Sequence, residues 1–488
     1  MIGLLIQDNA YEQDIRELLM SFYPGETYAH EVKEGVDFYV QTRLEDGEAV
    51  IGIWEKLENG EELEGWTLTA HSTGKADLSD HSATKNVIKK LFYQMLVKRT
   101  GHELPWGSLT GIRPTKIALS RLEDGWKEED IRKFMKETYM TSDEKINLSI
   151  EIAAREKRLL EPLDYDRGYS LYVGIPFCPT TCLYCSFTSY PIGIWKKRVD
   201  AYLEALFKEI DFVAEHFKDK VLDTIYIGGG TPTSLSADQL DRLLTKIEES
   251  LDLSGLLEFT VEAGRPDSIT RDKLEALHRH GIGRISINPQ TMNQKTLDLI
   301  GRHHTVEQVI DSFHLAREVG FATINMDLIV GLPGEHMEDV EHTMSVIKEL
   351  DPDNLTVHSL AIKRSARLNL EWDKYQDLHM ENSEKHMALA HRTAQALGME
   401  PYYLYRQKNM TGNLENIGFA KEGKAGLYNI LIMEEKQSIV ALGAGAACKC
   451  VSDHGLTVTR CENVKDVGLY IERIDEMIER KRELFSER

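Results

Sequence analysis

Three cysteines within eight residues carry the clearest chemical signal in this sequence. They lie in the segment Cys178-Pro-Thr-Thr-Cys182-Leu-Tyr-Cys185, so three thiols can wrap around one metal centre from a short loop. Zinc normally takes four protein ligands, and no fourth Cys or His is close by in the sequence. Three thiolates suit a four-iron, four-sulfur cluster with one iron left open for a substrate or cofactor. A zinc site with a remote ligand and three unrelated buried cysteines are the alternatives.

Other unusual residues occur where apolar runs of the sequence end. The segment Gly228-Gly229-Gly230-Thr231-Pro232 follows one such run, and its glycines would let backbone groups reach a ligand. It fits neither the P-loop nor the GxGxxG pattern. Glu262 and Gln290 follow the next two runs, and Asp327 is a lone acid inside a fourth. A buried charge such as Asp327 is unfavourable without a partner or a role. Taken alone, a tight turn or a structural role would explain each of these features, but several of them at the ends of successive runs indicate a binding site.

The elements that must position these residues alternate regularly from Tyr169 onward. Amphipathic helical segments, such as 197–217 and 237–251, separate apolar runs that are typical of strands. The alternation predicts a parallel sheet, and its spacing predicts a full or partial (β/α) barrel, with a doubly wound open sheet as the alternative. In a barrel, the cysteines and glycines would fall in the loops after the strands, where such folds place their chemistry. The six predicted strands are 169–175, 224–227, 258–262, 284–288, 323–330 and 354–360.

The rest of the chain divides into an N-terminal and a C-terminal part. Residues 1–165 are predicted to be an α+β domain of unknown role, and a polar stretch with a Pro and a Gly (161–168) ends it. Residues 166–370 are the barrel, and residues 371–488 are a C-terminal substrate or lid module. The N-terminal elements are helices at 11–22, 82–99, 113–123, 127–138 and 142–161 and strands at 38–44 and 49–57; the C-terminal ones are a helix at 381–397, strands at 427–433 and 438–442, a hairpin around 453–455 and a helix from 466.

Composition excludes several classes of protein. The 488 residues include 80 Asp and Glu against 58 Lys and Arg, a net charge of −22, which disfavours nucleic acid and anionic membrane surfaces. No apolar run approaches the roughly 20 residues that span a bilayer. The first ten residues lack the basic region of a signal peptide, so a cytoplasmic location is expected. Six cysteines are too few for a disulfide scaffold.

The cysteine motif, with Tyr184 before its last cysteine, resembles the signature of radical S-adenosylmethionine (SAM) enzymes. The resemblance implies that Cys178, Cys182 and Cys185 bind a [4Fe-4S] cluster and that SAM chelates the open iron. In that family, reduction of the cluster cleaves SAM to a 5′-deoxyadenosyl radical, so the cofactor carries the difficult chemistry and the protein positions it.

The residues at the strand ends resemble the oxygen-independent coproporphyrinogen III oxidase (dehydrogenase) family, and the long N-terminal domain is similar to its HemZ-type subgroup. The resemblance implies a partial (β/α)6 TIM-like barrel with an α+β N-terminal domain and a C-terminal α/β module. It also implies one or two bound SAM molecules. The cofactor-binding residues that it implies are Tyr172, Tyr184, Gly229, Gly230, Thr231, Glu262, Gln290, Arg302, Asp327 and Ala361.

The same resemblance implies a substrate and a reaction. Coproporphyrinogen III would be oxidatively decarboxylated to protoporphyrinogen IX, in porphyrin and heme biosynthesis, with an unidentified electron donor and acceptor. Its four propionates call for cations that can bind carboxylates, despite the acidic composition. The candidates are Lys363, Arg364, Arg367, Arg406 and Lys408.

One departure from the family pattern leaves alternatives open. Phe187 occupies the position where the founding dehydrogenase has a fourth cysteine, and related heme chaperones share that change. A heme-binding chaperone on the same scaffold is therefore one alternative, and a radical SAM enzyme that acts on another tetrapyrrole or transfers a methyl group is another. Near the C-terminus, Cys448 and Cys450 are predicted to be buried on a strand with Cys461 opposite across a hairpin, a second metal site being the alternative. His303 and His304 are predicted to be polar surface residues.

Overall fold

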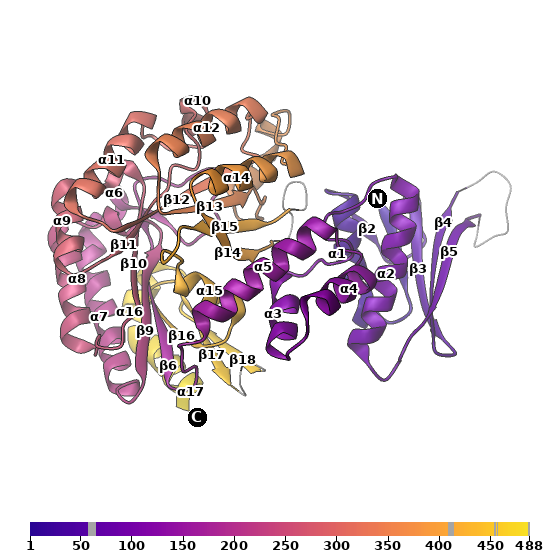
Figure 1. Cartoon of the computed structure of the whole chain (residues 1–488), viewed down its shortest axis with the longest axis horizontal. Coiled ribbons are helices and arrows are strands. Elements are labelled where there is room, and N and C mark those ends of the chain that lie inside the picture. Colours follow the sequence, from indigo (N-terminus) through magenta and orange to yellow (C-terminus); the bar gives the residue numbers. More distant parts are fainter. Residues whose placement is uncertain (57–64, 408–413, 453–454, 456, 487–488) are drawn as a thin grey trace. The chain divides into compact units, whose positions relative to one another are not determined.

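A computed structural model describes residues 1–56, 65–407, 414–452, 455 and 457–486 (Figure 1). In these residues the chain forms two compact units. The first comprises residues 1–154 and a short segment that begins at Arg406, and the second comprises residues 155–405 and the remaining C-terminal part. The chain thus passes from one unit to the other inside helix α5 (Asp143–Leu160), before the polar stretch at 161–168.

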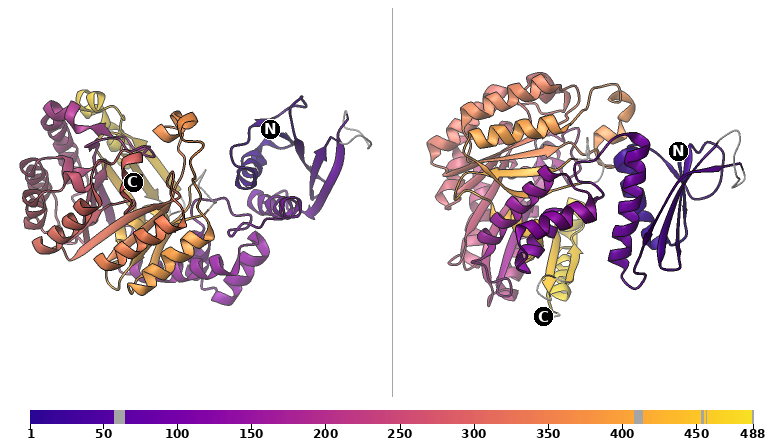
Figure 2. Two further views of the ribbon diagram at one scale, coloured as in Figure 1. Left: turned by 90° about the horizontal axis from the view of Figure 1, so that it is seen from above. Right: turned by 45° about the vertical axis from the view of Figure 1, so that its right-hand side comes forward.

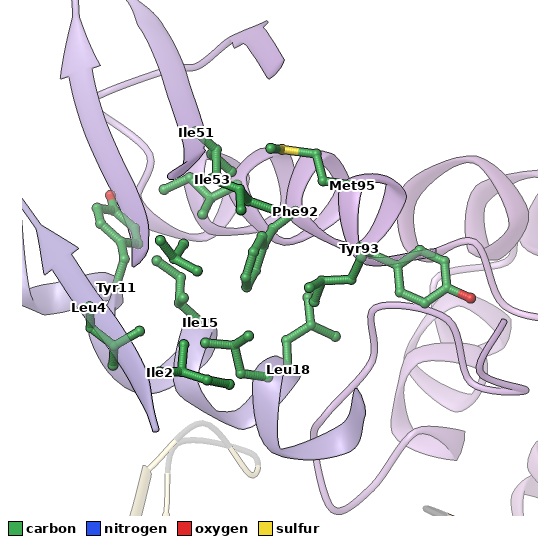
Figure 3. Close-up of a cluster of buried hydrophobic side chains, with 14 of the residues drawn as sticks. Ile2, Leu4, Tyr11, Ile15, Leu18, Ile51, Ile53, Phe92, Tyr93 and Met95 are labelled. Atoms are coloured by element: carbon green, nitrogen blue, oxygen red, sulfur yellow. The ribbon is translucent and has the colours of Figure 1, made fainter. Parts of the chain in front are cut away.

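The first unit is a mixed sheet covered by helices. Its described strands pair in the order β2-β1-β3-β4-β5. The apolar face of the sheet packs against two helices through residues such as Ile15, Ile51 and Phe92, all of which are fully or almost fully buried (Figure 3). Asp80 caps the second of these helices, because its carboxylate accepts hydrogen bonds from the backbone N–H groups of Ser82 and Ala83. The elements are β1 (Ile2–Ile6), α1 (Glu12–Phe22), β2 (Tyr28–Ala29), β3 (Phe38–Glu45), β4 (Glu48–Glu55), β5 (Thr67–Lys75), α2 (His81–Thr100), α3 (Thr115–Glu123) and α4 (Glu128–Tyr139).

The second unit contains the predicted barrel. All six predicted strands are confirmed, and within the described part of the chain they pair in the order β13-β12-β11-β10-β9-β6 with every neighbour parallel. This sequential order differs from a doubly wound sheet, in which the strand order reverses. The strands are β6 (Gly168–Ile175), β9 (Val221–Gly229), β10 (Glu258–Gly264), β11 (Arg284–Ile287), β12 (Thr323–Val330) and β13 (Asn354–Ser359).

Helices connect successive barrel strands and cover the outer face of the curved sheet (Figure 2). Each presents an apolar stripe to the strands; in α8, for example, Leu240, Leu243, Leu244 and Ile247 are buried. The predicted helices at 197–217 and 237–251 are confirmed. The connecting helices are α7 (Val199–His216), α8 (Ala237–Ser250), α9 (Arg271–Arg279), α10 (Gln294–Leu299), α11 (Val306–Val319) and α12 (Met337–Leu350).

The residues after 370 extend the same sheet on both sides. Strand β15 pairs antiparallel with β13 at one side, and β16 pairs parallel with β6 at the other. The strand predicted at 438–442 is confirmed, but the one predicted at 427–433 is wrong, because these residues form helix α15. Of the predicted turn at 453–455, residues 453 and 454 lie outside the described residues. The short helix α13 (Arg367–Leu370) precedes this part, and its elements are α14 (Glu384–Ala396), β14 (Glu400–Tyr405), β15 (Asn416–Ala420), α15 (Leu427–Glu434), β16 (Ser438–Leu442), β17 (Ala447–Ser452), β18 (Thr457–Glu462), α16 (Val467–Glu472) and α17 (Ile474–Ser486).

None of the helices in the described residues has both the length and the apolar character needed to cross a membrane.

Candidate functional site

The cysteine loop follows the first barrel strand, as predicted. Cys178 ends the two-residue strand β7 (Phe177–Cys178), which pairs with β8 (Tyr190–Pro191) on the far side of the loop. Two hydrogen bonds fix the loop to the segment after α10: Leu183 N donates to Ile300 O at 2.9 Å, and Thr180 Oγ1 donates to Gly301 O at 3.0 Å. The three cysteines therefore project from a loop that the protein scaffold holds in place.

The surroundings of the cysteines favour a group that neutralises thiolate charge. Burial raises the pKa of Cys178 to about 11, although the hydroxyl of Thr231, 3.4 Å from its sulfur, opposes the shift. Burial also raises the pKa of Cys185. Two guanidinium groups, those of Arg265 and Arg302, each place Nη1 3.9 Å from the sulfur of Cys182. Because metal binding displaces thiol protons, an iron–sulfur cluster would relieve this unfavourable burial, and the donor set fits one.

Among the described residues, no group of three or more His, Cys, Asp or Glu side chains is arranged to hold a single metal ion.

The glycine turn after β9 packs directly against the cysteine loop. Gly230 N donates to Ile175 O at 2.8 Å, and Thr231 N donates to Phe177 O at 2.7 Å. A Cβ atom on Gly230 would lie 2.6 Å from Phe177 O and 3.0 Å from the sulfur of Cys178, so only glycine fits. Gly229 has φ +105°, a backbone conformation that favours glycine, and its Cβ would lie 3.2 Å from the hydroxyl of Tyr172. The structure therefore brings Tyr172, the glycine turn and Cys178 together.

A half-buried carboxylate, Glu262, lies near the end of β10. The hydroxyl of Tyr226 on β9 donates to Glu262 Oε1, and Asn288 Nδ2 after β11 donates to Oε2 at 2.8 Å. Burial and the negative charge of Asp327 raise the pKa of Glu262 to about 7. Two neighbouring strands thus orient this carboxyl, and it exchanges its proton near neutral pH.

Asp327 on β12 is the second acid of the interior. Burial acts to raise its pKa, but the nearby His358 together with Asn325 and Thr356 holds the pKa below its usual value. His358 Nε2 lies 3.8 Å from Asp327 Oδ2, and Asn325 Nδ2 donates to Oδ1 at 2.8 Å. On the other side of the imidazole, the hydroxyl of Tyr405 lies 3.3 Å from His358 Nδ1. Asp327 is therefore an ionised acid held by a histidine.

Gln290 and Arg302 bring unpaired polar atoms to the same region. Gln290 has φ +71°, and its backbone N–H donates to Asp327 O at 3.0 Å, while its side-chain Oε1 is buried without a hydrogen bond among the described residues. Arg302 is 3% exposed; Nη1 donates to the hydroxyl of Tyr184 at 3.3 Å, and Nε has no described partner. Unpaired buried polar atoms are unfavourable, so these residues fit a polar ligand that would complete their hydrogen bonds.

The predicted cations differ in burial and in the unit to which they belong. Lys363 is half-buried, and burial lowers its pKa. Arg364 and Arg367 are exposed, and the Arg367 guanidinium forms an ion pair with Glu371 at 3.2 Å. Arg406 belongs to the first unit, where its Nη1 donates to Leu109 O at 2.6 Å, and Lys408 lies outside the described residues. Ala361, after β13, is half-buried and offers only its backbone and a methyl group. The described candidates therefore belong to both units of the chain.

His304 corrects a sequence prediction. It was expected at the surface but is fully buried, and burial together with the Arg302 guanidinium lowers its pKa to about 3. Sequence reasoning also missed Tyr226, Asn288, Arg265 and His358. The position of Asn288 at the end of a predicted strand could have indicated a site residue. No feature of the sequence indicates the long-range contacts of Tyr226 and His358.

Comparisons with known proteins are consistent with this geometry. The Radical SAM superfamily matches residues 172–347. The oxygen-independent coproporphyrinogen-III oxidase-like protein HemZ of Bacillus subtilis (strain 168) is 38% identical over 485 residues, which cover 98% of this chain and 96% of that protein. The heme chaperone HemW of the same organism is 35% identical over 309 residues, 63% of this chain and 76% of HemW. The solved structure of the coproporphyrinogen III oxidase HemN from Escherichia coli, a radical SAM enzyme, is 25% identical with a TM-score of 0.51, covering 64% of this chain and 70% of that one.

Proposed function

We propose a function from the family of this chain, which belongs to the radical SAM superfamily and, within it, to the oxygen-independent coproporphyrinogen III oxidase-like family. The proposed reaction is the oxidative decarboxylation of coproporphyrinogen III to protoporphyrinogen IX. Its cofactors are those of the superfamily, a [4Fe-4S] cluster and SAM. The observation that carries the proposal is the similarity to HemZ, which extends over both units of the chain, whereas the similarity to HemW covers a smaller part.

The proposed reaction converts two propionate side chains of the substrate into vinyl groups. Each propionate loses one hydrogen atom from its β-carbon, one electron and one molecule of carbon dioxide. When bound, the cluster and SAM supply the radical that takes the hydrogen atom, and an external one-electron acceptor takes the electron. The protein contributes binding, orientation and exclusion of water.

We assign the cofactor contacts to residues of the cysteine loop and the strand ends. Cys178, Cys182 and Cys185 would bind the cluster, and the guanidinium groups of Arg265 and Arg302 would balance the negative charge near Cys182. The backbone of Gly229, Gly230 and Thr231 would approach SAM, because that turn packs beside Cys178 and the glycines place no side chain in the way.

The interior acids have distinct roles in this proposal. Tyr226 and Asn288 hold the carboxyl of Glu262, so that it can accept hydrogen bonds from a ligand amino or hydroxyl group. Asp327, kept ionised by His358, would face a cationic group of a ligand, and Gln290 and Arg302 would use their unpaired atoms on polar groups of the same ligand.

A second candidate function is favoured by one observation. The ring of Phe187, two residues after Cys185, is 75% exposed, and the side chain of Ile194 nearby in the sequence is 79% exposed. Large exposed apolar side chains often mark binding surfaces, and a flat porphyrin would cover them. A heme-binding chaperone would use such a surface, and it would not require a pocket of cations for free propionates.

One experiment separates the two functions. The chain is reconstituted anaerobically with iron and sulfide and is then given SAM, a reductant, a one-electron acceptor and coproporphyrinogen III. We expect 5′-deoxyadenosine together with protoporphyrinogen IX and carbon dioxide. Deoxyadenosine without decarboxylated product would remove the substrate assignment, and tight heme binding without turnover would favour the chaperone.

The cluster assignment has its own matched control. Cys182→Ala is expected to abolish the visible absorbance of the cluster, because the remaining pair of loop thiols cannot hold it. Cys450→Ala, a substitution of another buried cysteine, is expected to keep the absorbance. A Cys182→Ala protein with full absorbance and activity would contradict the assignment.

A further inference from the structure

Two cysteines face each other across the hairpin of β17 and β18, away from the cysteine loop in the sequence. The register of the two antiparallel strands places Cys448 directly opposite Cys461, as the sequence suggested. Directly opposite residues have Cα atoms about 4.5–5.5 Å apart, which lies within the range of roughly 4.4–6.8 Å that a disulfide spans. Both thiols are free, so the backbone is already placed for a bond that has not formed.

The two thiols differ in exposure and in charge. Cys448 is 1% exposed, whereas Cys461 is half-buried and can be reached from solvent. A hydrogen bond from the Cys448 thiol lowers the pKa of Cys461, and the positive charges of Lys481 and Arg480 lower it further against the opposing effect of burial. Burial raises the pKa of Cys448. Cys461 is therefore the more acidic thiol of the pair and Cys448 the less acidic one, which suits Cys461 to the attacking role in a reactive cysteine pair.

A buried ion pair fixes the lysine that supplies this charge. Lys481 on α17 is 1% exposed; its Nζ lies 2.6 Å from Glu209 Oε1 and donates to Asn463 Oδ1 at 2.5 Å. Glu209 Oε2 in turn accepts hydrogen bonds from the backbone of Gly443, at 2.7 Å, and from the hydroxyl of Tyr470. Because these contacts hold the ammonium group in place, its effect on the thiol pair is built into the fold.

We propose that Cys448 and Cys461 form a site of reversible thiol oxidation, at which Cys461 attacks a low-molecular-weight disulfide such as oxidised glutathione and Cys448 then resolves the mixed disulfide. The attack breaks the glutathione S–S bond and releases one glutathione thiolate. The Cys448 thiol then loses its proton, and its sulfur displaces the second glutathione from Cys461. Two protein thiols are oxidised to one disulfide, and one glutathione disulfide is reduced to two thiols.

The position of this pair connects it to the cysteine loop of the barrel. The ends of its two strands are joined by hydrogen bonds from Gly445 N to Val464 O and from Asn463 N to Ala446 O, both 2.9 Å. The same turn packs on the residues that follow Cys185: a Cβ on Gly445 would lie 2.7 Å from Thr188 Oγ1, and the hydroxyl of Tyr190 donates to Lys465 O at 3.1 Å. A disulfide here would therefore restrain a turn that supports the cluster-binding loop.

The test uses the full chain in anaerobic buffers with a stepped ratio of oxidised to reduced glutathione. After each step, free thiols are alkylated and the digested peptides are identified by mass spectrometry, which separates this pair from the three loop cysteines. We expect a linked peptide pair containing Cys448 and Cys461, which dithiothreitol releases. Without oxidant, we expect Cys461 to be alkylated at least about tenfold faster than the buried Cys450.

Three variants give each cysteine a separate readout. Cys448→Ser is expected to accumulate a glutathione adduct on Cys461, because nothing resolves the mixed disulfide. Cys461→Ser is expected to show neither the link nor an adduct on Cys448. Cys450→Ser is the matched control: Cys450 lies opposite Thr459, not opposite a thiol, so the variant should form the link normally.

The proposal would be overturned by a chain that stays fully reduced at every glutathione ratio, or by a link that involves Cys450. An adduct on Cys448 in the Cys461→Ser variant would also overturn it, because it would give the buried thiol the attacking role. The Cys461→Ser readout stands even if the Cys448→Ser protein fails to fold, because Cys461 lies at the solvent-accessible side of the hairpin.

Discussion

Replacing Gly230 with alanine is expected to damage the cysteine loop and the stability of the barrel together. The new Cβ would lie 2.6 Å from Phe177 O, which is 0.8 Å less than the 3.4 Å at which ordinary contact begins, and 2.9 Å from Ile175 O. Neither oxygen can retreat freely, since each accepts a hydrogen bond from the glycine turn itself. Overpacking of this kind costs about 1–3 kcal/mol, and losing one of the hydrogen bonds would account for about 1 kcal/mol of it.

The assay compares Gly230→Ala with Gly283→Ala, a substitution in the same unit. A Cβ on Gly283 meets nothing within 4 Å, so that control should leave the free energy of unfolding unchanged or raise it by up to about 1 kcal/mol. Urea unfolding gives the free energies, and iron and sulfide analysis gives the cluster content after reconstitution. We expect Gly230→Ala to lose both stability and cluster, because its Cβ also lies 3.0 Å from the sulfur of Cys178. Equal stability and equal cluster content in the two variants would refute the reasoning.

Two further predictions concern the core and the interior acid. Leu431→Ala is expected to lower the free energy of unfolding by about 2–5 kcal/mol, because Leu431 on α15 is fully buried. The control Leu370→Ala, at a 69% exposed position, should change the free energy of unfolding by less than about 0.5 kcal/mol. Similar urea midpoints for the two variants would contradict the placement of α15. Because the pKa of Glu262 is raised from 4.5 to about 7, the folded chain holds that proton more tightly than the unfolded chain, and the free energy of unfolding should fall as pH rises through this window. Between pH 5 and pH 7, the free energy of unfolding of Glu262→Gln should fall less than that of the unchanged chain, by about 1 kcal/mol or more. Parallel pH profiles of the two proteins in urea unfolding would contradict the raised pKa of Glu262.

The barrel strands were predictable because they are buried on both faces. Their sequences, such as Thr323–Val330, are largely apolar runs bounded by glycine and polar residues, and α/β alternation leaves few other arrangements. The cysteine loop and the glycine turn were predictable for a related reason. Their chemistry depends on residues that are adjacent in the sequence, so the spacing alone indicates the site.

The misassigned elements show where local patterns are ambiguous. The run Leu427–Met433 is apolar throughout, and a short apolar run fits a buried helix as well as a strand; in the structure it is α15, with Tyr428, Ile430 and Leu431 buried. Strand β5 was missed because Thr67–Lys75 is polar and lies at the edge of its sheet, where little of it is buried. His304 was placed at the surface because nothing in its neighbourhood of the sequence indicates burial.

The contacts that Tyr226 and Tyr405 make in the site could not be predicted from the sequence. Tyr226 meets Glu262 from a neighbouring strand, and Tyr405 meets His358 from a strand that follows 47 residues later. Such pairs depend on strand order and register, which no local pattern contains. In the same way, no local pattern indicates that Arg364 and Arg367 belong to the second unit while Arg406 belongs to the first.

The parallel pairing of β16 with β6 has a consequence for how the protein is made. Val440 lies beside Leu171, although 269 residues separate them in the sequence. At the usual rate of synthesis of about 5–20 residues per second, β6 leaves the ribosome roughly 13–54 s before the strand that covers its edge exists. During that interval the nascent barrel exposes an open strand edge beside its cysteine loop, and such edges invite aggregation. A chain that stops before residue 438 would keep this edge permanently open, so the first strand of the barrel depends on the last 51 residues of the chain.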